Sequence, residues 1–301
     1  MALTLSTVIL PHRPWHEGAR EEWTGAERLG FSAAYTYDHL SWRAFRDGPW
    51  FGAWPTLTAA ATATSTIRLG TLVTNPNFRH PVTLAKDLIT LDDISGGRVE
   101  LGIGAGTIGF DATVLGNQPW TPRERADRFA EFVALLDRLL TESDVSAEGR
   151  YFSAHEARNV PGCVQQPRIP FTIAAFGPRG YALTAKYGDA WVSTGDPSIF
   201  ETGTAAESDA AIAAQVARLD AACEQADRDP ASIRKVLLTG FTPEQNGPLE
   251  SLELFVDFAG RHRDLGFEEI VVHWPIPGTE FAAEMDVFEQ IATEALAHLA
   301  G

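Results

Sequence analysis

The chain has 301 residues, of which 45% are hydrophobic and 21% charged, as in ordinary soluble globular proteins. Its formal net charge of −16 argues against partners such as nucleic acid or an anionic membrane, which need a basic surface. No apolar run reaches the roughly 18 residues that a membrane span requires. The cysteines Cys163 and Cys223 have no metal-binding spacing, so we expect inert thiols, no metal and a reduced, cytoplasmic protein.

Short apolar runs alternate with longer stretches of helical period along the whole chain. Strands are expected at 3–10, 31–37, 67–73, 99–103, 171–175, 190–193, 234–239 and 269–273. Helices are expected at 17–29, 56–64, 81–94, 122–140, 181–187, 205–226, 249–265 and 281–299. Residues 141–170 are polar and rich in Pro and Gly, and we interpret them as an insertion with a short hairpin.

This alternation predicts an α/β fold, a (β/α)8 TIM barrel that forms one domain over residues 1–301. The stretch from Ser65 to Gly106 is one example of this alternation. Its predicted strand, crossover helix and second strand form a βαβ unit, in which the two strands are parallel. In a TIM barrel the functional residues lie in the loops after the carboxyl ends of the strands. We therefore expect function in those loops.

Asp38 and His39 directly follow the second predicted strand. In one interpretation Asp38 caps a turn beside a surface histidine. In the other, His39 exchanges a proton near neutral pH, while Asp38 contacts a polar ring or holds the loop in place. Both interpretations remain open from these residues alone.

Two glycine-containing segments end later strands. Gly104-Ala105-Gly106 either makes a turn only or lets a flat ring or a phosphate approach the backbone. The segment 176–180, FGPRG, ends a strand and opens a helix, so its N–H groups and Arg179 could hold a phosphate, unless the arginine lies in a solvated turn. Tryptophans on or beside these loops suggest a large pocket for a planar or hydrophobic ligand, namely Trp15, Trp42, Trp50, Trp54 and Trp274.

Several motifs in this order resemble the luciferase-like monooxygenase superfamily, particularly its coenzyme F420 (deazaflavin) branch. They are TYDHLSW, IRLGTLVTNPNFRHP, LAKDLITLDDISGGRVELGIGAG, RERADRFAEFVALLDRLL and IAAFGPRGYALTAKYGDAWVSTG. The family fold is a TIM barrel with an insertion, which agrees with the strand pattern.

The resemblance implies that an isoalloxazine-like ring lies across the barrel mouth, with His39 as the catalytic residue. Asp38 and Asn75 would contact the polar edge of the ring. Leu72-Val73 matches a bulge of the family, often with a non-prolyl cis peptide, that packs against one face of the ring. The rest of the cofactor would contact Ala105, Gly106, Thr107, Phe176, Gly177, Pro178, Arg179 and Gly180. We assign the substrate pocket to His12, Trp15, Trp42, Trp50 and Trp274.

The chain also departs from the sugar-phosphate dehydrogenases of this family. Thr107 stands where they carry Glu, Asp196 where they carry Lys, and Trp42 lies two residues nearer the Asp-His pair than their Trp. These changes argue against a sugar phosphate as substrate.

The resemblance implies an oxidoreductase that moves a hydride between coenzyme F420 and a small organic substrate, with His39 as proton donor or acceptor. An FMN-dependent monooxygenase of the same fold and a non-catalytic flavin-binding barrel remain as alternatives. The predicted binding partner is then a small-molecule substrate, and the chain could form a homodimer.

Overall fold

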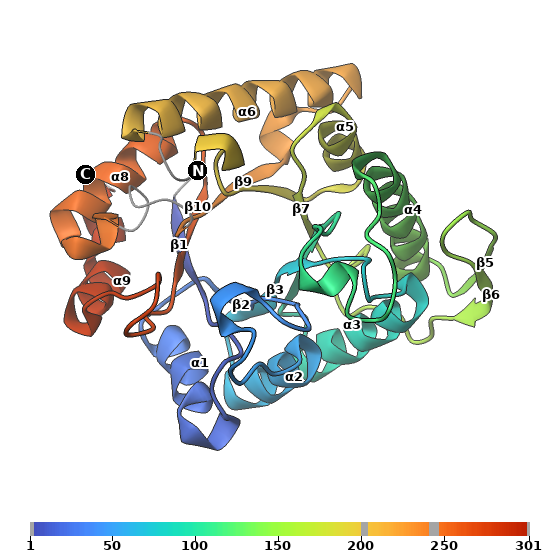
Figure 1. The fold of residues 1–301 in the computed structure, drawn as a ribbon, viewed down its shortest axis with the longest axis horizontal. Helices are drawn as coiled ribbons and strands as arrows, with labels where there is room; N and C mark the ends of the chain where they lie inside the picture. The colour runs from blue at the N-terminus through green and yellow to red at the C-terminus, as the bar shows by residue number, and fades with distance from the viewer. Residues whose placement is uncertain (1–2, 200–203, 241–246, 300–301) are drawn as a thin grey trace. The chain divides into compact units, whose positions relative to one another are not determined.

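The computed structural model describes residues 3–199, 204–240 and 247–299. Eight strands form a closed barrel in the order β1-β10-β9-β8-β7-β4-β3-β2, which confirms the predicted TIM-barrel fold (Figure 1). The barrel strands are β1 (Thr4–Val8), β2 (Ala33–Thr36), β3 (Arg68–Thr74), β4 (Val99–Gly104), β7 (Phe171–Ala174), β8 (Ala190–Ser193), β9 (Arg234–Leu238) and β10 (Glu269–His273).

Helices alternate with these strands. They are α1 (Ala19–Arg28), α2 (Ala53–Ala63), α3 (Pro81–Ser95), α4 (Pro122–Thr141), α5 (Pro178–Tyr187), α6 (Ala205–Gln225), α8 (Leu252–Asp264) and α9 (Met285–Leu299). Five of them begin elsewhere than predicted, and α1 begins two residues late, at Ala19. Helix α2 begins three residues early, so Trp54 is helical, and α5 begins at Pro178, whose ring favours the first helical position. Helix α8 begins only after Ser251, whose hydroxyl accepts a hydrogen bond from Leu254 N–H, and α9 begins at Met285.

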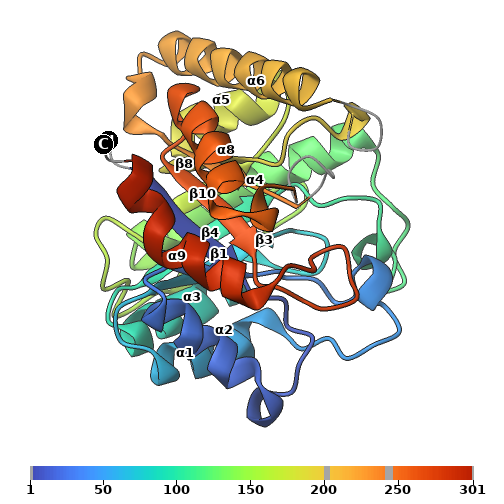
Figure 2. The same cartoon turned by 90° about the vertical axis from the view of Figure 1, so that its left-hand side faces the viewer.

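The chain divides into two compact units. The first unit comprises Met1–Ile9, Gly25–Ala34 and Ala175–Gly301, and the second comprises Leu10–Thr24 and Tyr35–Ala174. In the first unit, β10 pairs in parallel with β1 and β9, and β9 pairs in parallel with β8. Helices α8 and α9 pack against each other, and α9 also packs against β1 (Figure 2).

In the second unit, β4 lies between β3 and β7 and pairs with both in parallel. Helices α2, α3 and α4 pack one against the next along this part of the sheet (Figure 1). Gly102 allows β3 and β4 to meet closely, because a Cβ at this position would lie 2.1 Å from the carbonyl oxygen of Thr71. The predicted βαβ unit is therefore present as β3, α3 and β4.

The predicted insertion contains a hairpin, in which β5 (Asp144–Ala147) pairs with β6 (Ala154–Arg158) in antiparallel fashion. Glu131 of α4 anchors the loop between β5 and β6. Its carboxylate accepts backbone N–H bonds from Arg150 at 3.1 Å, Tyr151 at 2.8 Å and Phe152 at 2.6 Å. Gly149 must be small here, because a Cβ would lie 2.1 Å from Glu131 Oε1.

Both cysteine thiols are free and buried, and burial raises the pKa of each, as expected for unreactive thiols. Within the part of the chain that is described, no helix has the length and apolarity needed to cross a bilayer.

The contacts of Glu131 predict that Glu131→Gln destabilises the protein. A glutamine side chain has one acceptor oxygen, so its amide group would face a backbone N–H and leave it without a partner. We expect the free energy of unfolding in urea to fall by about 1–3 kcal/mol. Glu148→Gln, at an exposed position of the hairpin, is the matched control and should change it little. Equal effects of the two substitutions would contradict the proposed anchoring.

Candidate active site

The end of β2 places Asp38 in a buried ion pair. Its side chain is 1% exposed, and its carboxylate accepts two bonds from Arg79, at 2.6 Å from Nη2 and 3.0 Å from Nε. The Thr74 hydroxyl donates a third bond, of 2.9 Å. These contacts fit the expectation that Asp38 holds the loop in place, while its contact with a cofactor ring stays a prediction.

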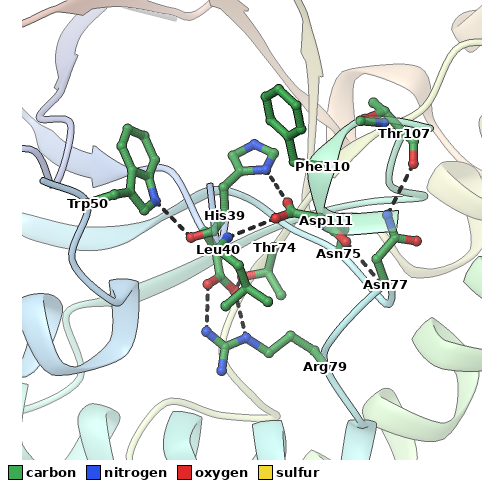
Figure 3. A network of polar contacts seen from close by, with 12 residues as sticks. His39, Leu40, Trp50, Thr74, Asn75, Asn77, Arg79, Thr107, Phe110 and Asp111 are labelled. Atoms are coloured by element: carbon green, nitrogen blue, oxygen red, sulfur yellow. Dashed lines mark hydrogen bonds and ion pairs between the residues drawn. The ribbon is translucent and has the colours of Figure 1, made fainter. Parts of the chain in front are cut away.

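His39 is held by a different partner. Its Nδ1 is hydrogen-bonded to Oδ2 of Asp111, and its Nε2 has no partner among the described residues. Asp111 Oδ1 accepts the backbone N–H of Leu40 at 2.8 Å. Figure 3 shows the His39 ring and the Arg79 guanidinium on opposite sides of this strand end. With 22% of its side chain exposed, His39 has one anchored nitrogen and one that can exchange a proton.

Asp111 was missed by the sequence analysis. It lies in a 3-10 helix, η3 (Phe110–Ala112), within a segment after β4 that has no strand or helix period, and 72 positions separate it from His39. One signal could have identified Asp111: it is a carboxylate in the loop after one strand, and His39 is an imidazole in the loop after another. In a TIM barrel both loops lie at the same end of the strands, so the two side chains can meet.

Aromatic side chains gather beside His39. Trp50 Nε1 donates a bond of 2.8 Å to the His39 carbonyl, and the Trp42 and Trp50 rings stack with centroids 6.2 Å apart. Phe45, also missed, contacts both tryptophans and meets the His12 ring edge-on at 5.7 Å. The structure thus brings together His12, Trp42 and Trp50 of the predicted pocket.

His12 presents a buried Nδ1 that has no hydrogen-bond partner in the described part of the chain. Burial, and secondarily the charge of Arg13, lowers the pKa of His12, so its ring is neutral near pH 7. Trp15 begins the 3-10 helix η1 (Trp15–Glu17) and is half-buried.

The end of β3 has the expected irregularity. The register with β4 shifts between Thr71 and Thr74, and the Leu72–Val73 peptide is cis. Leu72 is buried and Val73 half-buried.

The loop after β3 is tied to the loop after β4. Asn75 Oδ1 accepts the backbone N–H of Asn77, whose Nδ2 donates to the carbonyl of Thr107 at 3.1 Å. Gly106 has φ +77°, and a Cβ there would lie 2.9 Å from Asn77 Nδ2, so this position requires glycine. Ala105 is half-buried and Thr107 exposed, and all these predicted cofactor-binding residues lie within the second unit.

The segment 176–180 lies in the first unit. Because α5 begins at Pro178, Pro178, Arg179 and Gly180 form the first turn of this helix instead of a loop. The main-chain N–H groups of such a turn have no partner within the helix, which suits an anion. Phe176 is 46% exposed, and Gly177 precedes the helix as its N-cap.

Trp274 follows β10 and packs against helices of the first unit. Its ring packs edge-on against Phe288 of α9, with centroids 5.3 Å apart, and a Cβ at Gly25 of α1 would lie 3.1 Å from it. These contacts pack Trp274 against α1 and α9 of the first unit, and its assignment to the substrate pocket stays a prediction.

A family model described as luciferase-like monooxygenase matches residues 13–246. The chain belongs to the luciferase-like monooxygenase family. The chain is similar to an F420-dependent glucose-6-phosphate dehydrogenase of Beutenbergia cavernae, with 36% identity over 177 residues, or 56% of this chain and 50% of that protein. An F420-dependent hydroxymycolic acid dehydrogenase of Mycobacterium tuberculosis is 34% identical over 172 residues, or 56% and 46%.

The chain thus spans about half the length of the curated relatives that it matches. Among solved structures, the coenzyme F420 dependent tetrahydromethanopterin reductase from Methanopyrus kandleri has a TM-score of 0.76 at 19% identity, over 99% of this chain and 100% of that one. This likeness shows that the two chains share their fold.

The buried ion pair predicts that Arg79→Ala destabilises this luciferase-like chain strongly, because it leaves the Asp38 carboxylate buried without a cation. We expect a loss of about 3–5 kcal/mol in the free energy of unfolding, measured with urea. Arg79→Lys should lose less, since lysine keeps the charge but cannot donate the paired bonds. Lys86→Ala, at an exposed position of α3, is the control. If Arg79→Ala were as mild as this control, the ion pair would not stabilise the strand end.

Proposed function

We propose that this chain is an oxidoreductase that transfers a hydride between coenzyme F420 and a small organic substrate, with His39 as proton donor or acceptor. The observation that carries the proposal is the His39 imidazole at the end of β2, with Nδ1 bonded to Asp111 and Nε2 without a partner among the residues described. Two F420-dependent dehydrogenases among its relatives support the choice of cofactor.

The residues that follow β3 and β4 fit a flat ring system. Gly104 ends β4 beside the bulge at Leu72-Val73. A Cβ at this position would lie 3.0 Å from Val73 Cγ2, so a larger residue would crowd Val73, and glycine keeps this strand end flat. The buried Asn75 supplies an amide group for a polar ring edge. Leu72, Val73, Ala105, Gly106 and Thr107 would complete this contact surface.

A separate feature of the first unit, taken by itself, fits a phosphate group. The first turn of α5 offers the backbone N–H groups of Arg179 and Gly180, together with the exposed Arg179 guanidinium. Gly177 leaves this turn open, because a Cβ at this position would meet no atom within 4 Å.

Bound F420 would accept or supply the hydride at the substrate carbon. The chain handles the accompanying proton: Nε2 of His39 takes it from a substrate hydroxyl during oxidation and returns it during reduction. The neighbouring aromatic side chains of Trp42, Phe45 and Trp50 would exclude water from this exchange. His12, neutral and with an unpaired Nδ1, would orient a polar group of the substrate.

The substrate we propose carries no phosphate. Thr107 is exposed and uncharged, so it supplies no acid to the site. In the first unit, the backbone N–H and hydroxyl of Ser198 donate to Asp196 at 2.9 Å and 2.7 Å and lower the pKa of its carboxyl, which therefore stays ionised. This position of the first unit therefore carries no cation that could bind a phosphate group. A cytoplasmic location and a homodimer remain predictions.

An FMN-dependent monooxygenase is the second candidate, because the family model that matches this chain is described as luciferase-like monooxygenase. Parallel titrations of the purified chain with F420 and FMN, followed by cofactor fluorescence, separate the two. We expect F420 to bind and to be reduced or oxidised in the presence of substrate without oxygen uptake. FMN retention with oxygen uptake would favour the monooxygenase, and binding without turnover across a broad substrate panel would favour a non-catalytic barrel.

The assignment of His39 predicts that His39→Ala lowers kcat about 10²–10⁴-fold, the usual contribution of a positioned acid or base. The dissociation constant for F420 should change little. His16→Ala, which removes an exposed histidine in η1, is the control and should keep the wild-type rate. Full hydride-transfer activity in His39→Ala would show that another group handles the proton.

A further inference from the structure

We propose that Asp111 is a positioning residue that sets the tautomer and the direction of the His39 imidazole. This inference rests on the proposed function, because it gives Asp111 its task in the proton exchange of His39. Asp111 lies outside the motifs that carry the family resemblance.

The two oxygens of the Asp111 carboxylate hold two adjacent residues. One oxygen bonds the His39 ring at Nδ1, and the other accepts the Leu40 backbone N–H at 2.8 Å. Asp111 is only 6% exposed, so water does not compete readily for these oxygens. The carboxylate therefore fixes both the backbone and the ring at this point of the loop.

This contact determines which ring nitrogen carries the proton. An ionised carboxylate only accepts hydrogen bonds, so the bond to Asp111 requires a proton on Nδ1 of His39. A neutral imidazole then has a lone pair on Nε2, which is the nitrogen without a partner in the described structure. Nε2 can take a proton from a hydroxyl, and the resulting imidazolium can return it.

The segment that carries Asp111 has a second contact with the loop that carries His39. The guanidinium of Arg46 lies over the ring of Phe110, 4.2 Å from its centroid. On the other side, Trp50 holds the His39 carbonyl at 2.8 Å. Because these contacts do not involve the imidazole, the two loops can stay together when the bond between Asp111 and His39 is lost.

A purely structural role for Asp111 makes a different prediction. Such a role needs only the bond to Leu40 N–H, which the single oxygen of an asparagine can also accept. In Asp111→Asn the amide nitrogen would then face Nδ1 and donate to it, which moves the ring proton to Nε2. The substitution thus keeps the size and one bond of Asp111 but reverses the tautomer of His39.

The first test uses the chain without cofactor. Protein labelled with 15N-histidine is studied by NMR at alkaline pH, with the His39 signals assigned by their loss in His39→Gln. We expect the Nδ1–H tautomer in the wild type and in Asp47→Asn, an exposed carboxylate of the same loop used as control. Asp111→Asn should shift the population towards Nε2–H. An Nε2–H tautomer in the wild type, or no change in Asp111→Asn, would overturn the proposal.

The second test is a double-mutant cycle on kcat for F420 turnover. Asp111→Asn should lower kcat about 10²-fold, within the range for a positioned acid or base, with a smaller change in KM. In the His39→Ala background the same substitution should have almost no effect, because Asp111 acts through His39. Independent, multiplying losses would indicate a structural role and overturn the proposal.

A further variant and a comparison keep the two proposals apart. If Asp111→Asn does not fold, Asp111→Glu, which retains the carboxylate, should fold and keep the Nδ1–H tautomer; loss of that tautomer would count against the proposal. Absence of F420 turnover in the wild type would refute the proposed function, whereas the NMR result would still decide the role of Asp111. Turnover with an unchanged tautomer in Asp111→Asn would refute the positioning role alone.

Discussion

The buried ion pair between Asp38 and Arg79 is the interaction on which the candidate site depends. A carboxylate that is 1% exposed is stable only with a cation and further hydrogen bonds, and here Arg79 and Thr74 supply them. Asp38 follows β2, Thr74 ends β3 and Arg79 lies before α3, so one charge connects two neighbouring strand ends. His39 follows Asp38 directly, and its position is therefore set by an ion pair in which it takes no part.

Side-chain hydrogen bonds hold the surrounding loops of the second unit in place. Asn77 joins the loop after β3 to Thr107, and Asp111 joins the loop after β4 to Leu40. Each bond pairs a backbone group that has no partner in a strand or helix. Such bonds restrict the conformations of the loops and of the side chains that they carry.

The sequence predicted most of this framework because local pattern determines it. A β-branched run, a helical period and a second run identified β3, α3 and β4, and the position of His39 after a strand marked it as a candidate. Asp111 could not be found in this way, since its partner is 72 positions distant and its segment has no period. The contact of the Trp274 ring with Phe288 could not be predicted either, because only the tertiary structure brings β10 and α9 together.

The location of the acid in this site has a chemical consequence. The resemblance implies a glutamate at the position of Thr107 in the sugar-phosphate dehydrogenases of this family, whereas this chain has a carboxylate four residues later, at Asp111. An acid near the surface of a pocket can exchange a proton itself, whereas the buried carboxylate of Asp111 is already bonded to Nδ1 and to a backbone N–H, which suits the positioning role proposed for it. In the proposed reaction, proton exchange would then be concentrated on Nε2 of His39. A substrate for such a site needs one hydroxyl or carbonyl within reach of that nitrogen, and its remaining surface can be matched by the aromatic rings of Trp42, Phe45 and Trp50.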